Sequence, residues 1–292
     1  MTMAKNEEDW IETSVKSVLK FVDEVVVADN GSEDHTAEII ARLGRAFPEK
    51  IRVVKLIDED FVPAVNSLMR QTKYRWILRW HADFVAHTSG PLAIVNLIER
   101  AKAEDPHRYF CVNLSGVALD GDLDHQLPDR RDIPEPFLYT YSPWLRYYVR
   151  AHWEALHVPW FYQRAFWNEP YYFHLRRVKS STRLLQTIYW SRWFDERNKG
   201  ADISFHDFVE RSATRDYGVR TLGEAAQIAA LQVFRRCVRF DPAFWGDYPE
   251  LLKDLIDDPP YQLVYQDGTL VGRVDRTPHR FESSPEPELC PK

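Results

Sequence analysis

The sequence of 292 residues predicts an α/β fold in which a mostly parallel sheet is flanked by helices. Short apolar runs without polar alternation, such as residues 25–28, are typical of strands that are covered on both faces. Segments with apolar residues at helical spacing, such as residues 11–22, lie between these runs. Because strands and helices alternate through the first 118 residues, we expect right-handed crossovers between parallel strands.

The first expected elements follow one another closely. Residues 2–4 are a short strand candidate that runs directly into the polar stretch KNEE at 5–8. The helix expected next, over residues 11–22, has apolar side chains at Ile11, Val15, Val18 and Val22. The β-branched strand at 25–28 ends in the polar turn DNGS, and residues 36–43 follow as a second helix.

The same alternation continues to residue 119. We expect strands at residues 51–57, 75–80 and 109–119 and helices at residues 62–71 and 91–102. Gly90-Pro91 marks the start of the last helix, because proline is tolerated in a first helical turn.

The second half of the chain differs in composition and in the pattern of its apolar residues. Residues 121–136 are acidic and contain prolines, which is typical of a loop. An aromatic-rich stretch follows over 137–173, with a strand-like piece at 150–156. Residues 181–256 are predicted to be mainly helical. A hairpin is expected over 262–274 around Asp267-Gly268, and the tail from residue 282 is rich in Pro, Glu and Ser and is expected to be disordered.

Composition excludes several classes of protein. Hydrophobic residues make up 45% and charged residues 28%, so the chain is an ordinary globular protein. A net charge of -6 argues against a surface that is basic throughout. Three scattered cysteines, Cys111, Cys237 and Cys290, argue against a disulfide framework. No leader or apolar run of membrane-spanning length is visible, so we expect a soluble, cytoplasmic protein. Aromatic residues make up 14% of the chain, which is high. Such side chains either fill a large core or form a surface that binds flat or sugar-like ligands.

Polar motifs end three of the expected strands. They are KNEE at 5–8, DNGSEDHT at 29–36 and HAD at 81–83. Ligands bind α/β sheets beyond the carboxyl ends of the strands, where these motifs meet. A carboxylate there accepts hydrogen bonds from a base or ribose, a Gly/Ser turn offers backbone donors, and an acid can hold a hard cation against phosphates. Each motif alone is most often a turn or a solvated acid, but their order on successive strands points to a nucleotide site.

The same runs resemble a known family. The stretches MAKNEE (3–8), VVVADNGS (25–32), FVPAVN (61–66) and WILRWHAD (76–83) are similar to the start of a family 2 glycosyltransferase with the GT-A fold. The resemblance is strongest over residues 1–85 and thinner to about residue 179.

The resemblance implies site residues and a division of the chain. It places the nucleotide pocket at Ala4, Asn6, Glu8, Asp29, Asn30, Gly31, Asn66, His81 and Ala82, and it makes Asp83 a metal ligand. Together with the change of composition along the chain, it divides the chain into a nucleotide-sugar-binding half at 1–118, an acceptor-binding half at 119–185, a helical region with a hairpin at 186–281 and the tail at 282–292.

Two departures from the family pattern affect the site. His81 replaces the first acid of the family's Asp-x-Asp element, so one negative charge is lost. An imidazole at this position either binds ribose or shifts the metal preference from Mg²⁺ towards Mn²⁺, which tolerates nitrogen better. Val65 stands where the family often has an arginine, so a diphosphate or base contact has to come from elsewhere.

The stretch YYFHLRRVK at 171–179 offers such a replacement. In the resembling enzymes a late histidine often completes the metal site, and His174 is the match. The cations Arg176, Arg177 and Lys179 follow it and would neutralise a diphosphate leaving group. The alternative is a core histidine followed by a solvated basic segment.

An inverting transfer also needs a carboxylate that deprotonates the acceptor hydroxyl. Glu154 is the first candidate and Asp124 the second, with Asp122 in the same acidic loop. The expected function is a metal-dependent, inverting transfer of a sugar from a nucleotide diphosphate donor, with UDP favoured on family grounds and Mn²⁺ or Mg²⁺ as cofactor. The acceptor would be a saccharide, a lipid-linked molecule or a small molecule.

Two alternatives remain open. The first is a protein that binds nucleotide sugars without catalysis, because His81 and Val65 both replace family residues. The second is a glycosyltransferase that modifies nucleic acid, because arginines and aromatic residues interleave between residues 146 and 183 and could follow a phosphate backbone.

Overall fold

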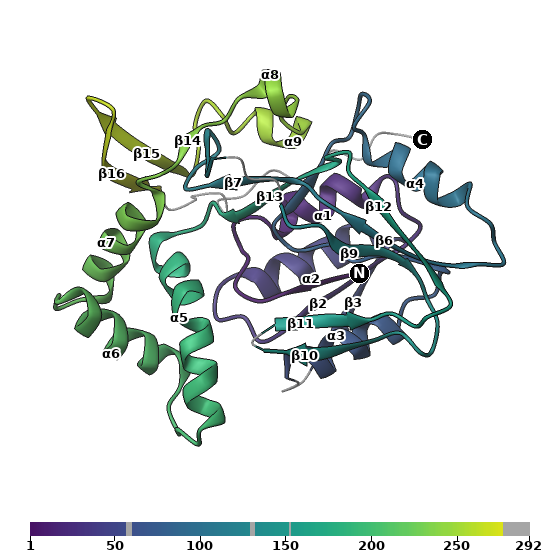
Figure 1. The fold of residues 1–292 in the computed structure, drawn as a ribbon, viewed down its shortest axis with the longest axis horizontal. Coiled ribbons are helices and arrows are strands. Elements are labelled where there is room, and N and C mark those ends of the chain that lie inside the picture. Colours follow the sequence, from purple (N-terminus) through teal and green to yellow (C-terminus); the bar gives the residue numbers. More distant parts are fainter. Residues whose placement is uncertain (57–59, 129–131, 152, 277–292) are drawn as a thin grey trace.

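The N-terminal sheet has three parallel strands in the order β1 (Thr2–Ala4), β2 (Val25–Asp29) and β3 (Ile51–Lys55). The computed structural model describes residues 1–56, 60–128, 132–151 and 153–276. Helices α1 (Ile11–Leu19) and α2 (Thr36–Ala46) connect these strands and bury their apolar stripes against the sheet (Figure 1). The predicted β-α alternation is confirmed here.

The centre of the molecule contains two further sheets of mixed direction. One has the order β12 (Tyr162–Trp167), β6 (Tyr109–Leu114), β9 (Glu135–Thr140) and β4 (Trp76–Leu78). The other has the order β5 (Phe84–Ala86), β13 (Tyr172–Arg177) and β7 (Val117–Asp120). Pairs β12–β6 and β13–β7 are parallel, whereas β9 runs antiparallel to both of its neighbours and β5 runs antiparallel to β13. Helices α3 (Phe61–Arg70) and α4 (Ile94–Lys102) complete this half.

Residues 109–119 are divided between two sheets, so the prediction of one strand is wrong. The division falls at Ser115 and Gly116, between β6 and β7. A Cβ on Gly116 would lie 2.4 Å from Cε2 of the Tyr172 ring, so only glycine permits this approach. The chain leaves the partners β9 and β12 at this point and joins β13.

The aromatic stretch and the expected acidic loop contain strands that the sequence did not reveal. The strand-like piece at 150–156 is part of a hairpin of β10 (Arg146–Arg150) and β11 (Trp153–His157). Within the loop expected at 121–136, β8 (His125–Gln126) pairs with β14 (Val238–Arg239), and β9 already begins at Glu135. The partner of β8 lies more than 100 residues away, which local sequence patterns do not show.

The C-terminal region is mainly helical, as predicted. Helices α5 (Ser181–Asn198), α6 (Phe205–Tyr217) and α7 (Leu222–Phe234) gather at one end of the molecule (Figure 1). Short helices α8 (Pro242–Trp245) and α9 (Glu250–Lys253) lead to the predicted hairpin of β15 (Tyr261–Gln266) and β16 (Thr269–Asp275). Its turn residues Asp267 and Gly268 both have positive φ, which suits Asp-Gly. The predicted disordered tail from residue 282 lies outside the described residues.

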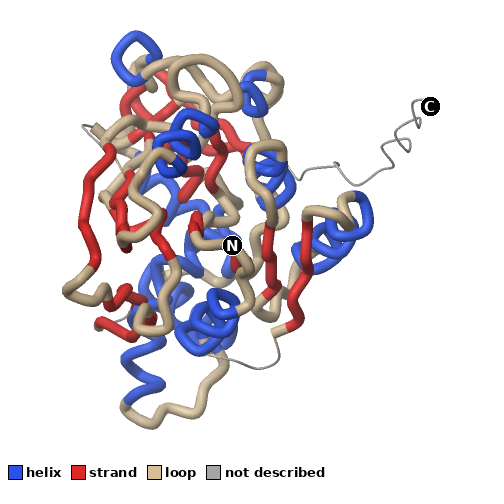
Figure 2. Tube along the Cα trace, turned by 90° about the vertical axis from the view of Figure 1, so that its right-hand side faces the viewer, coloured by secondary structure: helices blue, strands red, loops and turns tan. Residues whose placement is uncertain are grey.

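The first residues of the chain lie over the centre of the molecule in both views (Figures 1 and 2). The Met1 ammonium donates a hydrogen bond of 2.7 Å to the carbonyl oxygen of Leu78, and Trp80 N donates to Met1 O. These bonds hold the start of β1 next to the end of β4. Among the described helices, none combines the length and the apolar character that a membrane span requires.

Candidate active site at the strand ends

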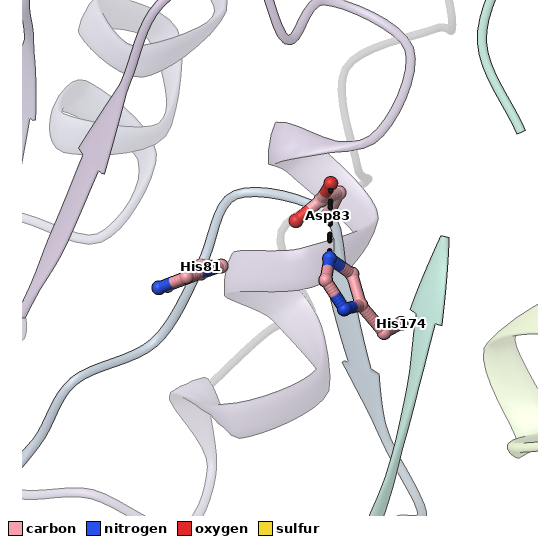
Figure 3. Close-up of side chains that lie close together, drawn as sticks. All are labelled: His81, Asp83 and His174. Carbon is pink, nitrogen blue, oxygen red and sulfur yellow. Dashed lines mark ion pairs between the residues drawn. The ribbon is translucent and has the colours of Figure 1, made fainter. Parts of the chain in front are cut away.

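The site is built around an aspartate and a histidine from two adjacent strands. Asp83 directly precedes β5, and His174 lies on β13, whose residue Leu175 donates its backbone N–H to the carbonyl oxygen of Asp83 at 2.9 Å. This pairing holds Asp83 Oδ2 and His174 Nε2 3.5 Å apart (Figure 3). The other ring nitrogen, His174 Nδ1, lies 2.5 Å from Asp132 Oδ2. Both side chains are buried, so the geometry is fixed by the sheet.

His81 completes a group of three potential metal ligands. One ligand atom from each of His81, Asp83 and His174 lies within 4.8 Å of the others. The His81 ring stacks on Phe84 and meets Phe137 edge-on, with ring centroids 4.7 and 5.0 Å apart. Among the described residues its buried Nε2 has no hydrogen-bond partner. Burial, assisted by Arg79, lowers the pKa of His81 well below its usual value, so the ring is neutral and can act as a ligand.

These three side chains fit a divalent cation. A separation of 3.5 Å between Asp83 Oδ2 and His174 Nε2 is compatible with two ligands of one metal ion, and the orphaned Nε2 of His81 offers a third donor. Asp132 orients the His174 ring through its second nitrogen, as carboxylates commonly do at metal sites. One oxygen and two nitrogens suit Mn²⁺ better than Mg²⁺, which prefers oxygen ligands.

Lys179 lies at the same group. Its ammonium is buried between Asp83 and Glu7, with Nζ 3.1 Å from Asp83 Oδ2 and 2.7 Å from Glu7 Oε1. Burial opposes the charge on Lys179, but the two carboxylates outweigh it and raise the pKa of its ammonium. Burial likewise opposes the charge on Asp83, but Lys179 and His174 hold the pKa of its carboxyl well below the usual range.

Glu7, rather than the predicted Glu8, faces this cluster. Burial raises the pKa of Glu7 although Lys179 opposes the rise, and Arg183 NH2 lies 3.8 Å from its carboxylate. Glu8 instead accepts hydrogen bonds from the backbone N–H of His35 at 3.0 Å, and its carboxylate lies 2.8 Å from Nδ1 of the same residue at the surface. The left-handed conformation of Asn6, with φ of 54°, lies directly before this change of side-chain direction.

The two loops predicted to line the nucleotide pocket are bonded to each other. Asn6 N donates to Ser32 Oγ at 2.8 Å, and Asn6 Oδ1 accepts from Glu33 N at 2.7 Å. Asp29 Oδ2 accepts the backbone N–H groups of Gly31 and Ser32, both at 3.1 Å. The predicted residues Ala4, Asn6, Asp29, Asn30 and Gly31 therefore lie together, and Asn30 N donates to the carbonyl oxygen of Ala4 at 2.8 Å. A nucleotide role for them stays a prediction.

Two other predicted nucleotide residues have structural contacts. Asn66 on α3 accepts a hydrogen bond from Tyr147 N at 2.8 Å and donates one to Tyr147 O at 2.9 Å, so its amide holds the β10–β11 hairpin. Ala82 is buried in the apolar cluster of the N-terminal sheet.

A second charged pair lies near the predicted metal ligands. Arg79 NH2 donates to Glu154 Oε1 at 2.6 Å, and the guanidinium lies 4.5 Å from the centre of the Tyr147 ring. Glu135 begins β9, the strand whose Phe137 ring lies beside the His81 ring. Loss of hydration raises the pKa of Glu135 although Arg79 opposes the rise, and Glu154 and Asp132 add to it.

Residues 1–130 match the family model described as Glycosyl transferase family 2. The matched range covers less than half of the chain and includes the motifs on which the predicted family rests. The match includes His81 and Asp83, whereas His174 and Lys179 reach the same site from outside the matched range.

Solved structures of glycosyltransferases are similar to this chain at low identity. S. aureus TarS 1-349 in complex with UDP is 19% identical, over 48% of this chain and 45% of that chain, with a TM-score of 0.36. The complex of TarS 1-349 with UDP-GlcNAc is 14% identical over 79% of each chain, with a TM-score of 0.41. The mannosyltransferase PcManGT from Pyrobaculum calidifontis, in complex with GDP-Man and Mn²⁺, is 14% identical over 80% of this chain and 73% of that chain, with a TM-score of 0.41. The chain thus spans less than half of the first of these structures. No curated protein matches the chain.

Of the remaining residues predicted for the glycosyltransferase, only Lys179 reaches the cluster at Asp83. Arg177 NH1 lies 3.1 Å from Asp120 Oδ1, and Arg176 is half-buried on the same strand. The carboxylate of Asp124 contacts Arg239 and Tyr248 in the C-terminal region, and its carbonyl oxygen accepts from Phe240 N. The diphosphate role of the three cations and the catalytic role of Asp124 and Glu154 stay predictions.

Neither Glu7 nor Glu135 is predicted at the site from the sequence, and for Arg183 the sequence suggests only contact with a phosphate backbone. Glu7 belongs to the KNEE motif. The motif therefore indicated the site, but it did not indicate which of the two adjacent glutamates, Glu7 or Glu8, faces it. Glu135 begins a strand inside a segment that was predicted to be a loop. No local pattern marks Arg183, which donates to the carbonyl oxygen of Lys5 at 2.7 Å across 178 residues.

Proposed function

We propose that this protein transfers a sugar from a nucleotide diphosphate donor to an acceptor hydroxyl with inversion at the anomeric carbon, and that the reaction depends on a divalent cation. The observation that carries the proposal is the convergence of Asp83, His174 and the orphaned imidazole of His81 at the strand ends of a family 2 domain. Asp83, His174 and His81 would hold the ion, with Asp132 fixing the orientation of His174.

When bound, a divalent cation would neutralise the negative charge that develops on the diphosphate as the sugar leaves. Lys179 supplies a further positive charge at the same point, because its ammonium already lies beside Asp83 and is shielded from water. Arg183 lies on the Glu7 side of this cluster and adds to the positive potential. In this arrangement Glu7 positions Lys179. The negative charge of the leaving group is then stabilised without proton transfer.

Glu135 is the carboxylate that best fits the general base. The acceptor oxygen forms a bond to the anomeric carbon while the bond from that carbon to the phosphate oxygen breaks, and the base takes the hydroxyl proton. A base needs an accessible carboxylate with a raised pKa near the reacting atoms. Glu135 is exposed and its pKa is raised, whereas Glu154 is held by Arg79. Asp124 is bound to Arg239 away from the cluster.

A donor panel tests the proposal. UDP-, GDP- and TDP-sugars are incubated with the protein and Mn²⁺, Mg²⁺ or a chelator, and thermal stabilisation and release of nucleoside diphosphate are measured. We expect one donor to stabilise the protein and to be hydrolysed slowly, with more turnover in Mn²⁺ than in Mg²⁺. Asp83→Asn should abolish the metal-dependent turnover and weaken Mn²⁺ binding in calorimetry. Asp257→Asn is the matched control, because Asp257 is exposed and lies outside the cluster.

The outcomes separate the alternatives. A donor that stabilises the protein but is never hydrolysed or transferred would indicate a binding protein without catalysis. A turnover rate that Asp83→Asn leaves unchanged would exclude the proposed metal site. If no nucleotide sugar stabilises the protein or turns over, the proposed function is wrong.

A further inference from the structure

The β10–β11 hairpin has two chemically different faces. Side chains alternate along its strands, so Tyr147 and Glu154 point inward, where Tyr147 packs against Asn66 on α3 and Glu154 reaches Arg79. The opposite face is defined by Arg146, Tyr148, Arg150, Trp153 and His157, and all five side chains are exposed. In Figure 1 the hairpin lies at the edge of the molecule, beside α3.

A cluster of aromatic rings continues this exposed face at the base of the hairpin. Trp144 precedes β10, Trp160 follows β11, and both pack edge-on against Phe161 with centroid distances of 5.8 and 5.9 Å. Tyr109 meets Phe161 at 5.3 Å from the neighbouring strand. Trp160 is 94% exposed and Trp144 is 63% exposed, although a tryptophan side chain has a large apolar area that folded proteins usually bury.

The exposed polar groups of this face are cationic. Arg146 and Arg150 project from the hairpin beside Trp153, which is 51% exposed, and no carboxylate stands on the outward positions of the two strands. Arg108 borders the ring cluster, where it forms a surface pair with Asp105 at 3.2 Å. Within the described part of the chain, neither Arg146 nor Arg150 forms an ion pair. Their charge therefore stands out against the net charge of -6 of the whole chain.

We propose that this aromatic and cationic face docks the protein on an anionic lipid bilayer. Tryptophan and tyrosine favour the boundary between headgroups and acyl chains, and each arginine near the surface gains from the negative potential of anionic lipids. A second copy of the chain fits less well, because a two-fold contact through this face would set Arg146 and Arg150 against their own equivalents. A nucleic acid fits less well because two hairpin arginines neutralise few phosphates.

Docking would place the bilayer next to the site. Glu154, on the inner side of the same hairpin, contacts Arg79, so only the hairpin separates the proposed bilayer surface from the second charged pair of the site. Together with the proposed function, this favours an acceptor that is anchored in the bilayer. The docking itself does not depend on that function, since it involves no donor and no cation.

Vesicle flotation tests the docking. The full chain is mixed with vesicles of phosphatidylcholine alone or with added phosphatidylglycerol, at low and high salt. We expect retention on the anionic vesicles that weakens with salt. Trp144→Ser with Trp160→Ser, and separately Arg146→Gln with Arg150→Gln, should each lower the partition coefficient roughly tenfold or more. In the wild type, brominated lipids should quench tryptophan fluorescence, which requires no variant.

The controls match the variants in chemistry and exposure. Phe244→Ser removes a ring that is 72% exposed on α8, and Arg220→Gln with Arg235→Gln removes two exposed charges on other elements. Both should leave retention unchanged, and an unchanged melting temperature shows that the hairpin variants fold. Retention that the hairpin variants do not reduce, or no retention on anionic vesicles at low salt, overturns the proposal. So does binding to single-stranded oligonucleotides without binding to vesicles, or a dimer that the same variants dissociate. None of these outcomes bears on donor turnover.

Discussion

At the scale of single residues, the site contains a buried ammonium group, that of Lys179, in contact with two largely buried carboxylates. Lys179 is the cation that Asp83 and Glu7 share, and its loss would leave both carboxylates with weaker compensation. The same oxygen of Asp83 also lies within reach of His174. A donor diphosphate and its cation would therefore exchange partners with Lys179 rather than enter an empty apolar space.

The first prediction concerns Glu135. Glu135→Gln removes the proposed base but keeps the shape of the side chain, so we expect the rate of transfer to fall by about 10²–10⁴ while donor binding stays the same. A base must be deprotonated, and the pKa of Glu135 is raised, so the wild-type rate should fall as the pH drops through that value. Steady-state kinetics over pH check this, and the acidic limb should vanish in the variant.

Glu99→Gln is the control for this experiment, because Glu99 forms only a surface pair with Lys102. If Glu154→Gln abolishes transfer and Glu135→Gln does not, the base is Glu154 and the role given to Glu135 is wrong.

The second prediction concerns Lys179. Lys179→Met leaves Glu7 and Asp83 without their shared cation, so we expect a loss of about 3–5 kcal/mol in the free energy of unfolding. The combined change of Lys179→Met with Glu7→Gln should recover part of this loss, because one of the two unpaired carboxylates is gone. Urea denaturation of the four proteins measures the coupling, and the absence of recovery would contradict the pairing.

At the scale of elements, the β10–β11 hairpin is held by two side chains from other parts of the chain, Asn66 and Arg79. Asn66 on α3 bonds to both the N–H and the carbonyl of Tyr147, as a neighbouring strand would. The hairpin has only two strands, and such ribbons are marginally stable by themselves. Its inner contacts with Asn66 and Arg79 therefore set the position of Glu154 and of the exposed aromatic face.

The third prediction follows from this contact. Asn66→Ala leaves two backbone groups of Tyr147 without partners, and each costs about 1–3 kcal/mol if it stays buried. We expect the hairpin to open locally, so hydrogen exchange should accelerate over residues 146–157 and stay unchanged in β2. Mass spectrometry of exchanged peptides checks this. Asn96→Ala is the control, because the amide of Asn96 bonds to Gly90 and Pro91 at the surface.

At the scale of the whole molecule, the C-terminal hairpin forms hydrogen bonds to residues that are distant in the sequence. Arg273 on β16 donates to the carbonyl oxygens of Gly121 and Lys179 and pairs with Asp275 at 2.5 Å. Tyr261 on β15 donates to Asp9 at 2.8 Å across 252 residues. These contacts fix the backbone at Lys179, and so the hairpin after the last helix contributes to the geometry of the site.

The fourth prediction tests these contacts. Arg273→Met removes a fully buried guanidinium and leaves Asp275 unpaired, so we expect a loss of about 3–5 kcal/mol in the free energy of unfolding. Arg276→Met is the control, since Arg276 forms an exposed pair with Asp258 that should contribute less than about 1 kcal/mol. Thermal and urea denaturation measure both. Equal effects of the two variants would contradict the role of Arg273.

The fifth prediction concerns pH. Glu250 on α9 accepts hydrogen bonds from Thr88 N and Thr88 Oγ1, both at 2.7 Å, and also from Ser89. Partial burial would raise the pKa of Glu250, but these bonds outweigh it and lower the pKa from 4.5 to about 2. A depressed pKa stabilises the fold above the unfolded value, so the contribution is present at neutral pH and is lost between about pH 4.5 and 2.

Glu250→Gln should therefore destabilise the protein at pH 7 by about 1–2 kcal/mol. The difference between variant and wild type should shrink as the pH falls towards 2, as measured by denaturation at several pH values. A difference that is constant over this range would show that the charge of Glu250 is not involved.

The sequence by itself determined the β-α alternation of the first residues, from β1 to β4, and the polar groups that follow these strands. Local periodicity and turn residues decide these features: Asp29 ends β2, and Asp83 lies in the segment between β4 and β5. The GT-A prediction rested on the same motifs, and the family match includes all of them up to residue 130.

Only the tertiary structure decided which of these groups meet. Glu7 faces Lys179 across 172 residues, and β8 pairs with β14 at the far end of the chain. Gly116 lies against a tyrosine ring that comes 56 residues later in the chain, and Asn66 bonds to the backbone of a hairpin 81 residues away. Side-chain direction after a left-handed residue, strand partners and the pairing of buried charges all depend on contacts distant in sequence. Local sequence patterns determine which chemical groups follow the strands, and long-range packing determines which of these groups come into contact.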